Sequence, residues 1–187
     1  MKRQWNVSNE TIRKSEIYRI IVNLGFPAIY TTNFDHCLET AFHAFGKPYK
    51  TIVCEKDFMS MPPDTTPIIK FHGDYEIPES MVLTESSYFE RLEFESPLDI
   101  KLRADMLEKQ FLFLGYSLSD INIRWLQFKR QKLWEQVAQE SRPLSYMFLA
   151  PPNQIQEKIF ENRGIHTFIG EHLDRTKSLR YFLKSLQ

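Results

Sequence analysis

Apolar and polar positions alternate along the chain with two different periods. From Asn9 to Leu24, apolar residues recur every three or four positions, which predicts a helix with one buried face. Ser8 or Asn9 is suited to cap its start, and Gly25 stands where a helix commonly ends. The short apolar run at 27–32 then predicts a buried strand. Helices and strands continue to alternate from here to the C-terminus.

Further strands are predicted at 49–54, 68–72, 111–114, 146–150 and 165–169. Further helices are predicted at 35–45, from Glu85, at 97–109, at 121–139, from Pro152 and at 174–185. Residues 55–67 contain several prolines and are predicted to form a loop. Strands that alternate with helices indicate an α/β, Rossmann-like fold with a mostly parallel sheet and crossover helices. We expect one domain over residues 1–187.

Polar residues follow three of the predicted strands. They are Thr31-Thr32-Asn33-Phe34-Asp35, Phe71-His72-Gly73-Asp74 and Gly115-Tyr116-Ser117. Ligands of parallel α/β sheets bind at the carboxyl ends of the strands. We therefore expect the three segments to meet at one rim of the sheet.

These segments resemble motifs of the sirtuin superfamily. The stretch 29–35 resembles T-[TQ]-N-[FYI]-D, the stretch 69–73 resembles [KE]-[LF]-H-G, and the stretch 111–120 resembles G-[TY]-S-L-x-[DV]. The form G-Y-S-L-x-D is typical of the sirtuin-like NAD-degrading proteins of bacterial phage defence. The motifs follow one another in the family's order, and the resemblance covers about residues 20–130.

The resemblance implies a sirtuin-like NAD-binding domain with NAD as its substrate. It implies that Asn33 holds the nicotinamide-side ribose and positions a water, while Asp35 supports the same loop or contacts the nicotinamide side. It also implies that His72 is the general base toward a ribose hydroxyl. Gly115 and Ser117 would approach the adenosine-side ribose or the phosphates. The other motif residues that would line the NAD site are Thr31, Thr32, Gly73 and Asp120.

These residue types suit cleavage of the nicotinamide–ribose bond. An imidazole can accept a ribose proton near neutral pH, and an amide can orient a water and a hydroxyl together. Each assignment also has a purely structural alternative. His72 could simply end a strand, Asn33 and Asp35 could form a turn and a helix cap, and Ser117 with Asp120 could cap the next helix.

Glycine is scarce, and the spacing of the six glycines excludes any G-x-G pair. A Rossmann fingerprint and a phosphate-binding P-loop are therefore absent from this sequence. Sirtuin-like folds open with a strand and a G-A-G loop that cradles the pyrophosphate. We therefore expect a domain that is incomplete at its N-terminus, with a homo-oligomer or a partner chain completing the site. Without that cradle, we expect weakened NAD binding.

Charge and cysteine content narrow the function further. Lys+Arg and Asp+Glu both total 24, so we expect no nucleic-acid partner. Two cysteines cannot build the four-cysteine zinc module of protein-deacylating sirtuins, so we expect no zinc and no other metal. No apolar run is long enough for a membrane span or a signal peptide, so we expect a cytoplasmic protein without a membrane partner.

Three functions are compatible with these features. The sequence favours a sirtuin-like NAD+ hydrolase that acts in anti-phage defence and is active alone or only in an assembly. The alternative is a catalytically impaired module that binds a nucleotide or a partner protein. An NAD-dependent protein deacylase is the third, and the missing zinc module weighs against it.

Overall fold

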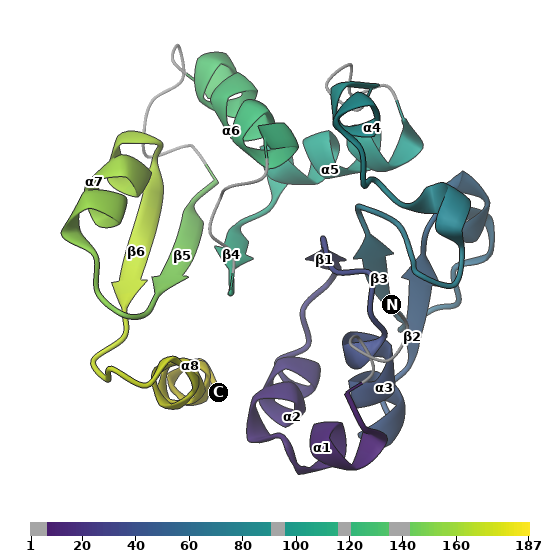
Figure 1. The fold of residues 1–187 in the computed structure, drawn as a ribbon, viewed down its shortest axis with the longest axis horizontal. Helices are drawn as coiled ribbons and strands as arrows, with labels where there is room; N and C mark the ends of the chain where they lie inside the picture. The colour runs from purple at the N-terminus through teal and green to yellow at the C-terminus, as the bar shows by residue number, and fades with distance from the viewer. Residues whose placement is uncertain (1–6, 91–95, 116–120, 135–142) are drawn as a thin grey trace. The chain divides into compact units, whose positions relative to one another are not determined.

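Parallel strands with intervening helices make up both parts of the chain, which confirms the predicted α/β class (Figure 1). The computed structural model describes residues 7–90, 96–115, 121–134 and 143–187. The chain divides into two units. The first unit ends at Leu83 and also includes Leu183–Gln187, whereas the second unit is Thr84–Phe182. The assignment of one domain to residues 1–187 stays a prediction.

The first unit contains a three-stranded parallel sheet with the order β1-β3-β2. Its strands are β1 (Ile29–Thr31), β2 (Tyr49–Ile52) and β3 (Thr66–Lys70). Its helices are α1 (Asn9–Lys14), α2 (Glu16–Asn23) and α3 (Cys37–Ala44), with the short 3₁₀ helices η1 (Glu55–Ser60) and η2 (Pro78–Ser80).

The second unit contains another three-stranded parallel sheet, with the order β4-β5-β6. Its strands are β4 (Phe111–Phe113), β5 (Ser145–Leu149) and β6 (Ile165–Ile169). Its helices are α4 (Glu85–Glu90), α5 (Pro97–Glu108), α6 (Ile121–Trp134) and α7 (Gln154–Asn162). The last helix, α8 (Arg175–Ser185), begins in this unit and ends in the first. Phe182 of α8 stacks on Phe148 of β5, with ring centroids 4.8 Å apart.

The predicted helix at 9–24 is broken at Ser15. Ser15 has an extended backbone, with φ −76° and ψ 113°. Its amide ends α1 by donating to the carbonyl of Ile12, and its hydroxyl caps α2 by accepting from the amide of Tyr18. Ile12 before the break and Ile20 after it are both buried. The spacing of apolar residues therefore continues through Ser15 and gives no sign that the helix is broken there.

Strand β3 begins and ends two residues earlier than predicted. Pro67 lies inside it, although proline was expected to keep this position in a loop. Proline has no amide hydrogen to donate to a neighbouring strand. This does not disrupt the β1–β3 pairing, because that pairing begins only at Ile68, after Pro67. The earlier end places His72 in the turn after the strand rather than in the strand itself. The predicted loop at 55–67 also contains η1.

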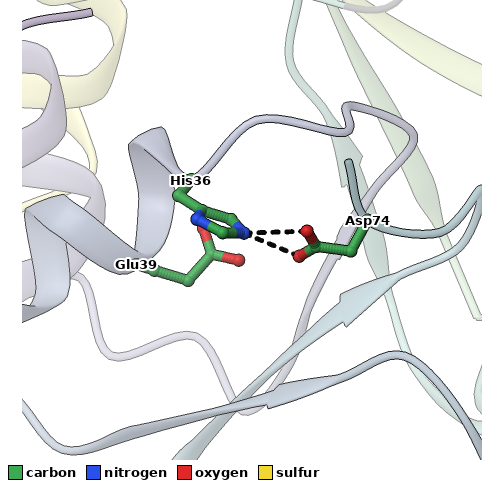
Figure 2. Close-up of side chains that lie close together, drawn as sticks. All are labelled: His36, Glu39 and Asp74. Atoms are coloured by element: carbon green, nitrogen blue, oxygen red, sulfur yellow. Dashed lines mark hydrogen bonds and ion pairs between the residues drawn. The ribbon is translucent and has the colours of Figure 1, made fainter. Parts of the chain in front are cut away.

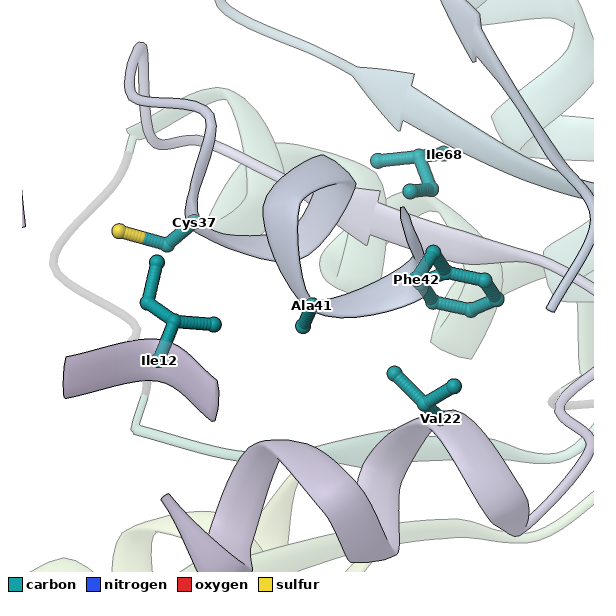
Figure 3. Packing of buried hydrophobic residues seen from close by; sticks show 6 residues of the cluster. All are labelled: Ile12, Val22, Cys37, Ala41, Phe42 and Ile68. Atoms are coloured by element: carbon teal, nitrogen blue, oxygen red, sulfur yellow. The ribbon is translucent and has the colours of Figure 1, made fainter. Parts of the chain in front are cut away.

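Helix α3 packs between the other N-terminal helices and the sheet of the first unit (Figure 3). Its Ala41 and Phe42 are buried against Ile12 of α1, Val22 of α2 and Ile68 of β3. This apolar contact fixes α3 on the sheet, and the motif residues after β1 lie between the end of β1 and the start of α3. Among the described residues, no helix has both the length and the apolar character needed to cross a membrane.

Candidate functional site

Two motif segments leave the sheet of the first unit side by side. Strands β1 and β3 are parallel neighbours, and Thr31 at the end of β1 is in register with Lys70 at the end of β3. Residues 32–36, the Asn33 loop, follow β1, and residues 71–74, the His72 turn, follow β3. The amide of Phe71 donates to the carbonyl of Thr31 at 2.8 Å, and the amide of Tyr75 donates to the carbonyl of Phe34 at 3.3 Å. The predicted meeting of these two segments is therefore observed.

The Asn33 loop holds its shape through local hydrogen bonds. The backbone amide of Asn33 donates to the hydroxyl of Thr31 at 3.1 Å, and the residue is exposed. One carboxylate oxygen of Asp35 accepts from the amide of Cys37 at 3.0 Å, at the start of α3. Asp35 therefore makes a turn contact just before α3, whose N-cap position is taken by His36. The half-buried Thr32 lies earlier in the loop.

His72 is almost completely buried, with 3% of its surface exposed. Its carbonyl accepts a hydrogen bond from the amide of Val82 at 2.9 Å, which fastens the turn to the chain ten residues further on. Its ring lies 5.7 Å from the ring of Phe71, measured between centroids. The backbone of the turn is therefore fastened to a later segment, and the His72 side chain is buried in the turn that follows β3.

Gly73 is needed for packing and for backbone conformation. Its φ is +94°, and a Cβ built on it would lie 2.2 Å from the carbonyl oxygen of Ser80. No side chain fits this space without movement of the backbone. Close packing against Ser80 is thus a sufficient reason for glycine here. A role of Gly73 in approaching NAD stays a prediction.

The third motif lies in the second unit. Gly115 follows β4 with φ +62° and an open space where a Cβ would stand. The other predicted residues of this motif, Ser117 and Asp120, lie outside the described residues. The meeting of all three segments at one rim therefore stays a prediction.

A buried lysine lies at the centre of the first two segments. Lys70 exposes none of its surface, and its Nζ donates to the carbonyls of Phe34 at 3.1 Å and Asp35 at 2.6 Å. The same Nζ lies 2.9 Å from Oδ2 of Asp74 and 3.3 Å from Oε1 of Glu39. Lys70 stands in a quoted motif, but sequence reasoning assigned it no role. The signal was a lysine at the end of an apolar strand with an aspartate four residues later.

Asp74 also binds a histidine on the other segment. Its two carboxylate oxygens lie 2.9 and 2.8 Å from Nε2 of His36 (Figure 2). Nδ1 of the same ring lies 3.2 Å from the hydroxyl of Tyr75. Burial alone would raise the pKa of Asp74, but hydrogen bonds from the amide of Glu76, Lys70 and His36 outweigh it and hold this pKa below its ordinary value.

His36, Glu39 and Asp74 satisfy one geometric condition for a metal site. Their ligand atoms all lie within 4.8 Å of one another (Figure 2). The Lys70 ammonium already supplies a positive charge to both carboxylates, at 3.3 and 2.9 Å. A divalent cation bound there would be repelled by this ammonium. We therefore read the cluster as an internal ion pair.

The Cys37 thiol faces Asp35 and Tyr18. Burial raises the pKa of Cys37 to about 11, and the hydrogen bond to Asp35 adds to this effect. Burial and the neighbouring Cys37 also raise the pKa of Tyr18. A thiol in this state is a poor nucleophile near neutral pH, so Cys37 supports Asp35 and the core rather than acting chemically.

A comparison of the sequence with known protein families identifies the family of this chain. The family described as SIR2-like domain matches residues 27–168, about three quarters of the chain. The chain belongs to the SIR2-like family. The match includes all three motif segments and extends from the first unit into the second.

Curated relatives of this SIR2-like chain include several proteins named NAD(+) hydrolase ThsA. The one from Enterococcus faecium is 32% identical over 136 residues, which are 66% of this chain and 28% of the relative. The one from Cytobacillus dafuensis is 31% identical over 113 residues, which are 60% of this chain and 23% of the relative. Defense-associated sirtuin 2 of Bacillus subtilis is 25% identical over 143 residues, which are 73% and 14% of the two chains. This SIR2-like chain therefore matches about a quarter, or less, of each relative.

Replacing Gly73 by alanine should destabilise the protein strongly. We expect Gly73→Ala to lose about 2–5 kcal/mol of unfolding free energy, because backbone strain and a clash with Ser80 add. Gly46→Ala is the matched control, since Gly46 has φ +66° and free space around its missing Cβ. It should lose only about 1–2 kcal/mol. Equal losses in urea unfolding would contradict the packing role of Gly73.

Asp74 should make stability depend on pH in the acid range. Its pKa is lower in the folded than in the unfolded protein, so its contribution is present above about pH 4 and is lost as the pH falls. We expect Asp74→Asn to be less stable than the unmodified chain at pH 7 but to lose less stability on going to pH 3. Glu79→Gln, which changes an exposed carboxylate near the same turn, should retain the full acid loss. Urea midpoints at both pH values test this.

The two cysteines should differ in reactivity. At pH 8, a pKa of about 11 leaves about one thousandth of Cys37 as thiolate, and the side chain is also buried. Cys54 is exposed. We expect iodoacetamide to label Cys54 first and Cys37 only after unfolding in urea, as read from peptide masses. Equal labelling rates in the folded protein would refute the assigned environment of Cys37.

Proposed function

We propose that this SIR2-like chain carries the nicotinamide side of an NAD+ hydrolase site that acts in anti-phage defence. The observation that carries the proposal is the pairing of the Asn33 loop with the His72 turn at one end of parallel neighbours β1 and β3. The names of the relatives, NAD(+) hydrolase and defense-associated sirtuin, support the substrate and the setting.

The proposed reaction balances without any redox partner. A water oxygen bonds to the anomeric carbon of the nicotinamide ribose, and the bond from this carbon to the ring nitrogen breaks. The bond's electron pair leaves with neutral nicotinamide. The water passes one proton to a ribose hydroxyl, which passes its own proton to His72, so the reaction releases one proton in all. The exposed Asn33 orients the ribose and the water, and His72 accepts a proton from a ribose hydroxyl. Asp35 keeps the loop in place through its bond to the start of α3.

Other motif residues are proposed to line the rest of the NAD site. Thr31, Thr32 and Gly73 lie in or next to the two segments, and Gly115, Ser117 and Asp120 are proposed to line the far part of the nucleotide. A second copy or a partner chain is proposed to complete the phosphate side, since the sequence contains no G-x-G loop. The proposed location is the cytoplasm, where a buried reduced thiol such as Cys37 is normal.

Binding without turnover is the second candidate. The observation that favours it is the burial of His72, which leaves 3% of its surface for contact with a substrate. Under this alternative, the chain binds NAD or a related nucleotide and releases no nicotinamide.

Nicotinamide release from millimolar NAD separates the two candidates. We expect the unmodified chain to release nicotinamide and His72→Ala to release it at least about 100-fold more slowly, the usual contribution of a general base. His43→Ala is the matched control, because His43 is exposed on α3. It should retain full activity, and thermal melting should show that both variants are folded.

One result would count against the role of His72, and another would count against the hydrolase. Undiminished release by His72→Ala would remove His72 from the reaction. Saturable NAD binding without any nicotinamide release, by the chain at concentrations that allow self-association, would favour the binding module instead.

A further inference from the structure

The ammonium of Lys70 contacts both segments that carry the proposed catalytic residues. It bonds to the carbonyls of Phe34 and Asp35 in the Asn33 loop. It also pairs with Asp74 in the His72 turn, with 2.9 Å between Nζ and Oδ2. Lys70 itself ends β3, the strand between β1 and β2. Its backbone is in register with Thr31 of β1, and the residue before it, Ile69, is also paired with Ile52 of β2.

The three donors of the ammonium are fully used in these contacts. Phe34, Asp35 and Asp74 each take one hydrogen, which is the full capacity of a lysine. Glu39 lies 3.3 Å away and contributes charge, and its carboxylate accepts no hydrogen bond from the described residues. Because Lys70 is also fully buried, it has neither a free hydrogen nor an exposed surface for a substrate.

Asp74 extends the same connection to a third residue of the Asn33 loop. Its carboxylate binds His36 as well as Lys70 and the amide of Glu76. The turn is therefore tied to the loop at three positions, through the carbonyls of Phe34 and Asp35 and through the ring of His36.

We propose that Lys70 is a positioning residue that clamps the Asn33 loop to the His72 turn and thereby sets the separation of Asn33 and His72. The clamp follows from the contacts above, and its effect on catalysis rests on the proposed hydrolase function. Lys70 acts through the two loops and does not touch NAD.

Hydrogen exchange of backbone amides tests the clamp without any need for activity. In Lys70→Met, which keeps the length of the side chain and removes its charge, the amides of Cys37, Phe71 and Tyr75 should exchange at least about ten-fold faster. These amides bond to Asp35, Thr31 and Phe34 within or beside the clamped segments. Unchanged protection of these amides in the folded variant would overturn the proposal.

Lys50→Met is the matched control from the neighbouring strand. The Nζ of Lys50 bonds to the carbonyl and the hydroxyl of Ser60, at 3.0 and 2.7 Å, and so ties β2 to η1. Its loss should leave the amides of Cys37, Phe71 and Tyr75 protected. Equal loosening in both variants would show a general effect of removing a lysine from this sheet and would overturn the specific role of Lys70.

Loss of Lys70 alone leaves two buried carboxylates without their cation, which can prevent folding. In that case Lys70→Met is combined with Glu39→Gln and Asp74→Asn, and the comparison is made with Asp74→Asn alone, in which Glu39 still balances the charge of Lys70. Faster exchange in the combined variant supports the clamp, and identical exchange overturns it.

Activity then tests the consequence for the reaction. At a temperature where the variant is fully folded, kcat should fall at least about ten-fold while KM changes less than about three-fold. Lys70→Met combined with His72→Ala should be no slower than His72→Ala alone, because the two residues act in one unit. A lowered melting temperature with unchanged kcat would show a purely structural role and overturn the proposal. If the unmodified chain releases no nicotinamide, the hydrolase proposal fails, and the exchange data still decide on the clamp.

Discussion

The parallel pairing of β1 with β3 is the constraint on which the rest of the candidate site depends. Two parallel strands that are adjacent must release their following segments at the same edge of the sheet. The register of Thr31 with Lys70 makes both strands end at the same level, so the Asn33 loop and the His72 turn start side by side. An antiparallel pairing of the same residues would place the two segments at opposite edges.

Strand pairing brings the Asn33 loop and the His72 turn together but does not fix their positions relative to each other. Polar contacts between the two segments fix these positions. A buried ion pair adds little net stability, because desolvation of both charges offsets their attraction. The Lys70 contacts therefore matter more for the arrangement than for the overall free energy of folding. The stability of this region comes instead from apolar packing, which holds α3 on the sheet beside the polar cluster. Its residues are Ile12, Val22, Ala41, Phe42 and Ile68.

Much of the fold could be predicted from the sequence, because short apolar runs and amphipathic segments alternate clearly. The strand after Gly25 and the helix after Asp35 were found within two residues at each end. The break at Ser15 was missed because it depends on two hydrogen bonds of a single residue. The amide of Ser15 ends α1 and its hydroxyl caps α2, and the spacing of apolar residues is unaffected by either bond. Pro67 misled the placement of β3, since its effect depends on which neighbour lies beside it.

The candidate site was only partly visible in the sequence. Asn33, Asp35 and His72 stand in short motifs, and the structure brings these residues to one edge. The role of Lys70 escaped notice because a lysine is ordinarily expected at the surface, and its burial depends on carbonyls from a loop thirty-five residues away. Gly73 was predicted to line the NAD site, which stays a prediction, and its close approach to Ser80 gives it a role in packing that the sequence did not show.

The chain between Gly73 and Val82 closes back on its own beginning. Ser80 packs on Gly73, its hydroxyl accepts from the amide of Asp74, and Val82 donates to the carbonyl of His72. The length of this small closed ring is therefore fixed by contacts at both ends. Insertions and deletions during the divergence of the family would disturb the turn if they fell here, so variation in length is expected to accumulate in other loops of the domain.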